Sequence, residues 1–139
     1  MYKYTDFDTI KELPDTVKAS ELAEAMGISL ARVYDYIEVK KMPYVLINRR
    51  KVLFKEHILQ NLDGYTEYTE ISKLKAINDL PKVFNPMKMR EALRISAAFA
   101  YDLTRYPGFP AVCPRNRVVV NKQGFITWIE DHMKNFKRK

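Results

Sequence analysis

The sequence is poor in the residues that usually form covalent cross-links, metal sites and catalytic centres. Its 139 residues include one cysteine, two histidines and four glycines. A single cysteine, Cys113, excludes an intrachain disulfide and a zinc cluster of cysteines, and His57 and His132 lie far apart in the sequence. We find no nucleotide-binding glycine loop and no nucleophile with its base. We therefore expect no enzyme, cofactor or metal, and expect Cys113 to be a small apolar residue.

Long hydrophobic runs are also missing. No segment approaches the ~20 apolar residues that span a bilayer, and the first residues contain no apolar signal sequence. The composition, 47% hydrophobic and 29% charged, is typical of a folded protein. We expect a cytoplasmic protein without a membrane partner.

Positive charge is concentrated in one half of the chain. The formal net charge is +7, of which residues 1–79 contribute −1 and residues 80–139 contribute +8. A basic half favours a polyanionic partner, although surplus lysine also serves solubility.

The chain repeats itself. Residues 13–45 placed on residues 80–112, an offset of 67, give 11 identities in 33 positions, where about two are expected from average composition. The matched pairs are Leu13/Leu80, Pro14/Pro81, Glu24/Glu91, Ala25/Ala92, Ile28/Ile95, Ser29/Ser96, Ala31/Ala98, Tyr34/Tyr101, Asp35/Asp102, Pro43/Pro110 and Val45/Val112. One structural module has been used twice.

The repeat predicts two domains. We place the first over residues 1–62, including an N-terminal arm, and the second, more basic one over 80–139. Residues 63–79 would connect them. Apolar residues recur at three-residue steps in this connection, which favours a partly helical linker, with a flexible tether as the alternative: Tyr68, Ile71, Leu74 and Ile77.

Both copies predict the order helix, turn, helix, hairpin, helix. In the first copy the helices are expected over 18–26, from Ser29 onwards and over 55–62, with a hairpin of Tyr44–Ile47 and Lys51–Phe54. The apolar stripe of the middle helix would be Val33, Tyr34 and Ile37. In the second copy we expect helices over 86–93, 97–105 and about 122–136, and strands over 111–113 and 117–120. A one-residue slip in the hairpin connection would then match Leu59 with Phe125 and Leu62 with Trp128.

This order, with its particular residues, resembles the winged helix-turn-helix of the excisionase and MerR-type family. The first copy carries the resemblance in Val17 to Ser29, Val33-Tyr34, Met42-Pro43, Asn48-Arg49-Arg50 and Val52-Leu53-Phe54. The second carries it in Leu93-Arg94-Ile95-Ser96, Tyr101, Phe109-Pro110, Arg115-Asn116-Arg117, Val118-Val119-Val120, Phe125 and Trp128. The resemblance implies a mainly α fold with short β-hairpin wings, arranged as two tandem winged helix-turn-helix domains.

The resemblance also implies double-stranded DNA as partner. In that family the second helix enters the major groove and the wing lies along the backbone or in the minor groove. By position, the contacts in the first copy would be Ser29, Arg32, Asp35 and Tyr36 from the helix, and Arg49, Arg50 and Lys51 from the wing. In the second copy they would be Arg115 and Arg117 from the wing.

The second recognition helix fits this role less well. Its Ala97, Ala98 and Phe99 cannot donate bidentate hydrogen bonds to guanine. Phe99 is either core or a protein contact, and we group it with Asp102 and Leu103 as candidate protein contacts. Asp35 and Asp102 either accept from a cytosine amino group or pair within the chain.

Two other groups have open assignments. Tyr34, Tyr101 and Trp128 match core positions, so we do not assign them to base stacking. The cations at the C-terminus either contact DNA or favour the end of the last helix through its dipole: Lys134, Lys137, Arg138 and Lys139.

Two functions remain. The first is a DNA-binding protein of a mobile genetic element, either an excisionase-like recombination directionality factor or a small transcriptional regulator. The alternative is an accessory subunit of a replication or recombination complex, whose winged helices mainly bind a protein such as an integrase, polymerase or initiator.

Overall fold

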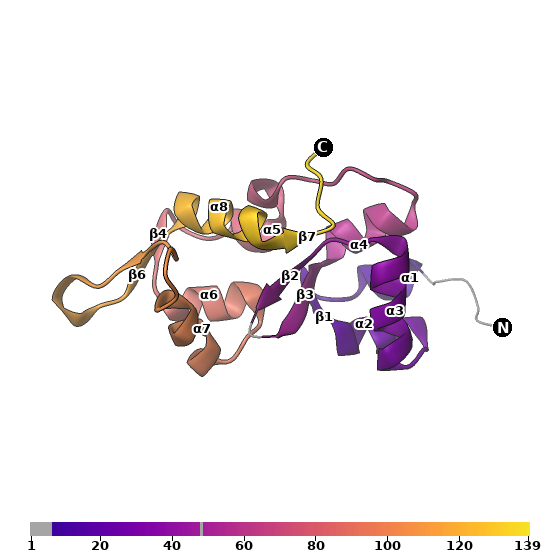
Figure 1. Cartoon of the computed structure of the whole chain (residues 1–139), viewed down its shortest axis with the longest axis horizontal. Coiled ribbons are helices and arrows are strands. Elements are labelled where there is room, and N and C mark those ends of the chain that lie inside the picture. The colour runs from indigo at the N-terminus through magenta and orange to yellow at the C-terminus, as the bar shows by residue number, and fades with distance from the viewer. Residues whose placement is uncertain (1–6, 48) are drawn as a thin grey trace. The chain divides into compact units, whose positions relative to one another are not determined.

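The computed structural model describes residues 7–47 and 49–139 and divides into two compact units. The first unit runs to Glu70 and also includes Met133–Lys139, and the second spans Ile71–His132. Both are mainly helical, and each holds one small antiparallel sheet (Figure 1). Residues 71–79, expected in a linker, thus belong to the second unit, and residues 133–139, expected in the second domain, belong to the first.

The elements of the first unit follow the predicted order, with three additions. It contains α1 (Phe7–Lys11), β1 (Thr16–Lys18), α2 (Ala19–Met26), α3 (Leu30–Lys40), β2 (Tyr44–Ile47), β3 (Arg50–Phe54), α4 (Lys55–Leu62) and β7 (Met133–Lys134). The sheet has the order β1-β3-β2-β7, with all pairs antiparallel. The predicted helices and the β2–β3 hairpin are confirmed, whereas α1, β1 and β7 were not expected.

The core of the first unit lies between its helices and its sheet. Leu22 of α2, Val33 and Ile37 of α3, Leu53 of β3 and Ile58 of α4 are all fully buried. Burying such a side chain contributes about 1.5–3 kcal/mol. The helical spacing of Val33 and Ile37 therefore fixes which face of α3 points inwards and leaves the opposite face to solvent.

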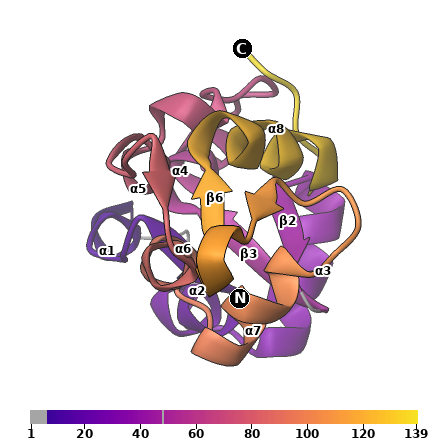
Figure 2. The same ribbon diagram turned by 90° about the vertical axis from the view of Figure 1, so that its left-hand side faces the viewer.

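The second unit repeats this plan. Its elements are η1 (Ile71–Lys73), α5 (Lys75–Asn78), β4 (Val83–Phe84), α6 (Pro86–Leu93), α7 (Ala97–Thr104), β5 (Ala111–Val112), η2 (Pro114–Asn116), β6 (Val119–Asn121) and α8 (Lys122–His132). The sheet order is β4-β6-β5. Figure 2 shows β6 between α8 and the helix pair α6 and α7. The strands are shorter than expected because the tip turns at Pro114, which lacks an amide donor.

The strand pairing keeps the 67-residue offset throughout the sheets. Val17 pairs with Leu53 in the first unit, and their counterparts Phe84 and Val120 pair in the second. Likewise Val45 pairs with Val52, as Val112 pairs with Val119. The two hairpins therefore have the same register.

The same offset continues into the last helix of each unit. Both α4 and α8 begin at a lysine whose ammonium donates to a backbone carbonyl near the first helix: Lys55 Nζ to Lys11 O at 3.0 Å, and Lys122 Nζ to Asn78 O at 2.9 Å. The predicted one-residue slip is wrong, because the fully buried counterpart of Phe125 is Ile58. The structural repeat covers residues 7–62 and 74–129.

The C-terminal residues form part of the first unit's sheet. The last helix ends at His132 and not near residue 136, and β7 then pairs with the edge of β2. The tail continues along Tyr68, whose amide donates to Lys137 O at 2.8 Å and whose carbonyl accepts from Lys139 N at 2.9 Å. These backbone bonds favour extended chain over a longer helix.

Candidate nucleic-acid interface

Each unit joins its helix pair by the same tight turn. In the first unit Gly27 is left-handed at φ 68°, and the amide of Ile28 donates to Ala23 O at 3.1 Å. In the second unit Arg94 takes the place of Gly27 at φ 55°, and the Ile95 amide donates to the equivalent carbonyl at 3.2 Å. This is the Schellman arrangement, which satisfies carbonyls at a helix end. It fixes the angle at which the second helix leaves the first.

The second helix of each pair begins at a capping serine. Ser29 Oγ accepts from the amide of Arg32 at 3.2 Å, and Ser96 Oγ accepts from that of Phe99 at 3.1 Å. Their backbone angles agree within one degree, at φ −72°, ψ 159° and φ −71°, ψ 159°. The predicted DNA contact Ser29 therefore has a structural role as helix cap.

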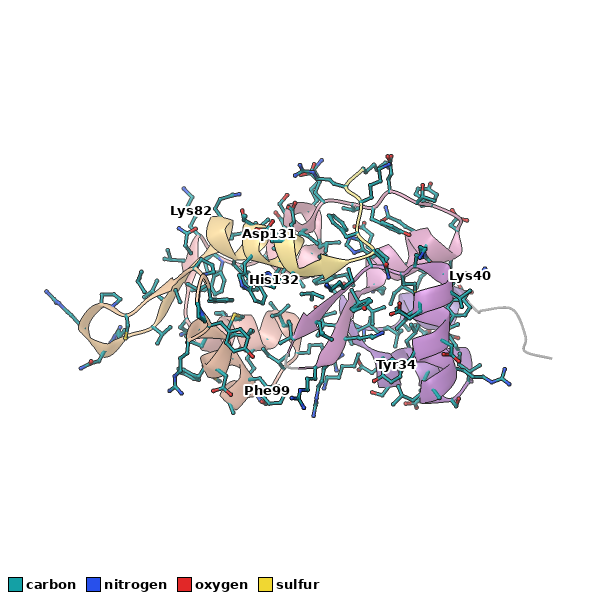
Figure 3. The ribbon with its side chains drawn as sticks, viewed as in Figure 1. Tyr34, Lys40, Lys82, Phe99, Asp131 and His132 are labelled. Carbon is teal, nitrogen blue, oxygen red and sulfur yellow. The ribbon has the colours of Figure 1, made fainter. Side chains whose placement is uncertain are left out.

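The outer face of α3 exposes most of the predicted helix contacts. Arg32 and Asp35 are exposed, whereas Tyr36 is half-buried and packs against the core. Tyr34 of α3 was expected in the core, but it is 39% exposed (Figure 3). The periodicity misplaced it because Val33 and Ile37 already complete the buried stripe.

Lys51 ties the hairpin to this helix. Its ammonium lies 2.9 Å from Glu38 Oε1, 4.6 Å from the centre of the Tyr44 ring and 5.3 Å from that of Tyr34. The hydrogen bond and charge of Lys51 hold the pKa of Glu38 below its usual value. Partial burial by itself lowers the pKa of Lys51, but Glu38 and Tyr44 outweigh it, and the pKa is raised.

This arrangement changes the interpretation of Lys51. A side chain held by one carboxylate and two aromatic rings positions the hairpin against α3. In this structure Lys51 therefore stabilises the packing of the hairpin against α3, the two elements that carry the predicted DNA contacts of the first unit.

Basic residues stand at the tip of each hairpin. Arg49 and Arg50 are exposed, Arg49 in the left-handed region at φ 67°, and Asn48 lies outside the described residues. In the second unit Arg115 and Asn116 take φ 50° and 64°, and the Arg117 amide closes the turn by donating to Pro114 O at 2.9 Å. Positive φ at two central residues is the type I′ geometry, which suits the twist of a hairpin.

The tip of the second hairpin extends away from the helices of its own unit. Figure 1 draws it in orange, projecting beyond β6. Arg115 and Arg117 are both exposed there. Guanidinium groups on such a projection can reach phosphates or a narrow minor groove while the helices keep their packing.

The second helix pair presents a different surface. Asp102 is exposed and lies 3.9 Å from Arg105, and Phe99 is half-buried on α7 (Figure 3). Leu103 was expected as a protein contact, but at 3% exposure it belongs to the core. Tyr101 was expected in the core and is 42% exposed. Trp128 is buried as expected, at 7% exposure.

Two further expectations are corrected by the structure. Cys113, expected to be a small apolar residue of the second copy, is an exposed free thiol beside the hairpin tip. The basic tail does not end a helix, because α8 ends at His132 and β7 follows it. In the tail Lys137 pairs with Glu67 at 3.7 Å and Lys139 lies over the Tyr65 ring at 5.8 Å.

The structural units redistribute the charge. Residues 1–70 and 133–139 hold 14 Lys/Arg and 12 Asp/Glu, a net of +2. Residues 71–132 hold 10 Lys/Arg and 5 Asp/Glu, a net of +5. Four cations of the basic half thus belong to the first unit, so both units carry net positive charge, which favours a polyanionic partner.

Sequence reasoning missed the exposed tyrosines, although a signal was present. Tyr34 and Tyr101 are identical in the two copies and follow Ala31 and Ala98 by three residues, which places them on one helix face. A residue that is identical in both copies but lies outside the buried stripe of the helix is expected at the surface.

The described residues contain neither a candidate metal site nor a candidate membrane-spanning helix. Among residues 7–47 and 49–139, no group of three or more His, Cys, Asp or Glu side chains could hold a metal ion. Within the same residues no helix is both long and apolar enough to cross a bilayer.

Comparison with known proteins gives no relative for this chain. No protein family, no curated protein and no solved structure matches it.

Proposed function

We propose that the chain is a non-enzymatic DNA-binding protein built from two winged helix-turn-helix modules. The observation that carries the proposal is the repeated combination of a serine-capped second helix and an antiparallel hairpin with an arginine tip. In each unit these two features follow one another along the chain, in the order typical of a recognition helix and a wing. The resemblance to excisionases and MerR-type proteins supports a role in excision or transcription in a mobile genetic element.

The hairpins would supply most of the affinity. Arg49, Arg50, Arg115 and Arg117 are exposed, and each cation that neutralises a phosphate releases counterions. Such contacts position the protein and carry little sequence information. Sequence reading would then fall to the outer faces of α3 and α7.

Fluorescence anisotropy with a labelled 30-bp duplex tests this proposal. Replacing one hairpin arginine by alanine should reduce the slope of log K against log salt by about one. The most informative pair is Arg50→Ala and Arg117→Ala, which occupy equivalent positions. Lys82→Ala is the control for lost charge, because Figure 3 shows Lys82 on the side of the second unit opposite Phe99 of α7. If both arginine variants keep the wild-type slope, the hairpins are not wings.

A second candidate function is that of an accessory subunit in replication or recombination. It is favoured by the surface of α7, where Phe99 replaces Arg32 and the exposed Tyr101 adds apolar area. Aromatic residues are enriched in protein interfaces. Recovery of a stoichiometric protein partner that Phe99→Ala abolishes, with duplex affinity no tighter than about 10⁻⁴ to 10⁻⁶ M, would favour this function.

A further inference from the structure

The two units can be compared residue by residue, because the 67-residue offset holds from the first helix to the last. Buried identities between the copies follow from the shared core. Identities that are exposed in both copies need another reason. They are Pro14/Pro81, Glu24/Glu91, Ser29/Ser96, Ala31/Ala98, Tyr34/Tyr101, Asp35/Asp102 and Arg50/Arg117.

Three of these pairs form one surface. Ala31, Tyr34 and Asp35 stand at positions i, i+3 and i+4 of α3, so their side chains share a face of the helix. Their counterparts form the same face of α7. We call this set the Ala-Tyr-Asp stripe. The identical arginine Arg50/Arg117 stands at each hairpin.

Folding does not account for the stripe. Tyr34 and Tyr101 keep 39% and 42% of their surface exposed, and both aspartates are exposed. The ring of Tyr34 contacts Lys51, but the position of Lys51 is occupied by Val118 in the second unit. The identity of the tyrosines therefore does not follow from this contact.

We propose that the stripe reads the same short base-pair element in both units, so that the DNA site of this protein contains that element twice. The inference rests on the proposed DNA-binding function. The exposed arginine at each hairpin and the net positive charge of each unit are complementary to DNA. The stripe is common to both helices, although Arg32 of α3 is replaced by Phe99 in α7. The Tyr36/Leu103 difference lies at packed positions, so it does not distinguish the two surfaces.

The stripe has suitable chemistry for a major groove. An aspartate oxygen accepts a hydrogen bond from the N4 amino group of cytosine, and alanine contacts the methyl group of thymine. A tyrosine hydroxyl donates to a phosphate oxygen and fixes the register of the helix. Each element should therefore contain a cytosine opposite the aspartate.

Selection from a pool of duplexes with a randomised 30-bp core tests the proposal. The wild-type chain should enrich one short cytosine-containing element twice in each duplex. Asp35→Asn should change the preferred base at that position in one copy of the element, towards adenine, because an asparagine side chain pairs with adenine. Asp102→Asn should cause the same change in the other copy.

Matched controls are available in both units. Asp63→Asn at the end of α4 and Asp131→Asn near the end of α8 make the same chemical change at exposed sites outside the stripe (Figure 3 labels Asp131). Neither should alter the selected sequence. Each stripe variant should bind the wild-type duplex about tenfold more weakly and regain affinity on the adenine-substituted duplex. Thermal unfolding of all four variants checks that they fold.

Several results would overturn the inference. Two unlike elements in the selected duplexes, or asparagine variants without altered base preference, would refute shared reading. Salt-dependent binding without any enriched sequence, still weakened by Arg50→Ala, would refute it while leaving DNA binding intact. Failure to bind the pool at all, with capture of a protein that needs Tyr34 and Tyr101, would refute both proposals.

Discussion

Acidification should destabilise the first unit selectively, through His57. This side chain is fully buried, and its Nε2–H donates to the carbonyl oxygen of Thr69 at 2.8 Å. Its ring lies between those of Phe54, Tyr68 and Phe136, with centroid distances of 5.6, 5.7 and 5.4 Å. Nδ1 is buried without a hydrogen-bond partner among the described residues. A proton added at Nδ1 would therefore place an unpaired charge in the core.

The magnitude follows from the pKa. Burial lowers the pKa of His57 from 6.5 to about 4, against the opposing effect of the Thr69 hydrogen bond. The unfolded chain therefore binds this proton more readily than the folded chain does. The contribution of neutral His57 to the free energy of unfolding is complete above about pH 6.5 and is lost as the pH falls towards 4. At 1.36 kcal/mol for each pKa unit, the loss is about 2 kcal/mol at pH 5 and about 3 kcal/mol in full.

Urea unfolding at pH 7 and pH 5 measures this loss in each unit. The single tryptophan, Trp128, reports on the second unit, whose residue Gly124 occupies the position of His57. Amide exchange at Tyr68, which donates to Lys137 O, reports on the first unit. The first unit should lose about 2 kcal/mol more than the second.

His57→Leu is the decisive variant, because it removes the titrating group. The test compares pH dependence, so it holds whether the variant is more or less stable than wild type at pH 7. Its first unit should lose the excess pH dependence, and His132→Gln, a change at an exposed histidine, should retain it. Equal pH dependence in wild type and His57→Leu would refute the reasoning.

Two other predictions concern the helix caps of the two copies and the packing around Gly124. Ser29→Ala and Ser96→Ala each remove one helix cap and should cost about 1 kcal/mol. By amide exchange, each substitution should destabilise only the unit that contains the serine. Equal changes in exchange in both units would contradict the view that each cap stabilises its own unit alone. Gly124→Ala would place a Cβ 2.6 Å from Pro110 Cβ, so calorimetry should show a loss of about 1–3 kcal/mol from overpacking. An unchanged melting temperature would contradict this packing.

Most local structure could be predicted from the sequence because local signals agreed with the packing. Asn85 followed by Pro86 is a strong helix start, and α6 begins at that proline. Helix α4 also has the expected bounds, Lys55–Leu62. In these places capping, hydrophobic periodicity and turn residues all point to one structure.

The elements that were missed depend on distant pairing. The two-residue strands β4 and β7 contain too few residues for an alternating pattern, and they exist because Phe84 pairs with Val120 and Met133 pairs with Val45. The linker was misassigned because Ile77 was compared with its neighbours in sequence. Its counterpart Ile10 shows that it is a core residue of the repeat.

The candidate site was predicted less completely than the fold. Arginines at a hairpin tip are visible in the sequence, and Arg49 and Arg117 are exposed as expected. Whether a lysine faces solvent or a carboxylate depends on the angle between helix and hairpin, so the Lys51–Glu38 pair could not be foreseen. The exposure of Tyr34 could not be predicted for the same reason, because it also depends on how the helix and the hairpin pack.

The most direct test of the account is the salt dependence of duplex binding by a chain with all four hairpin arginines replaced. We expect the quadruple variant, with alanine at Arg49, Arg50, Arg115 and Arg117, to reduce the slope of log K against log salt by about four. Amide exchange should confirm that both units remain folded. A folded quadruple variant with the wild-type slope and affinity would contradict the proposal that the repeated hairpins are DNA-binding wings.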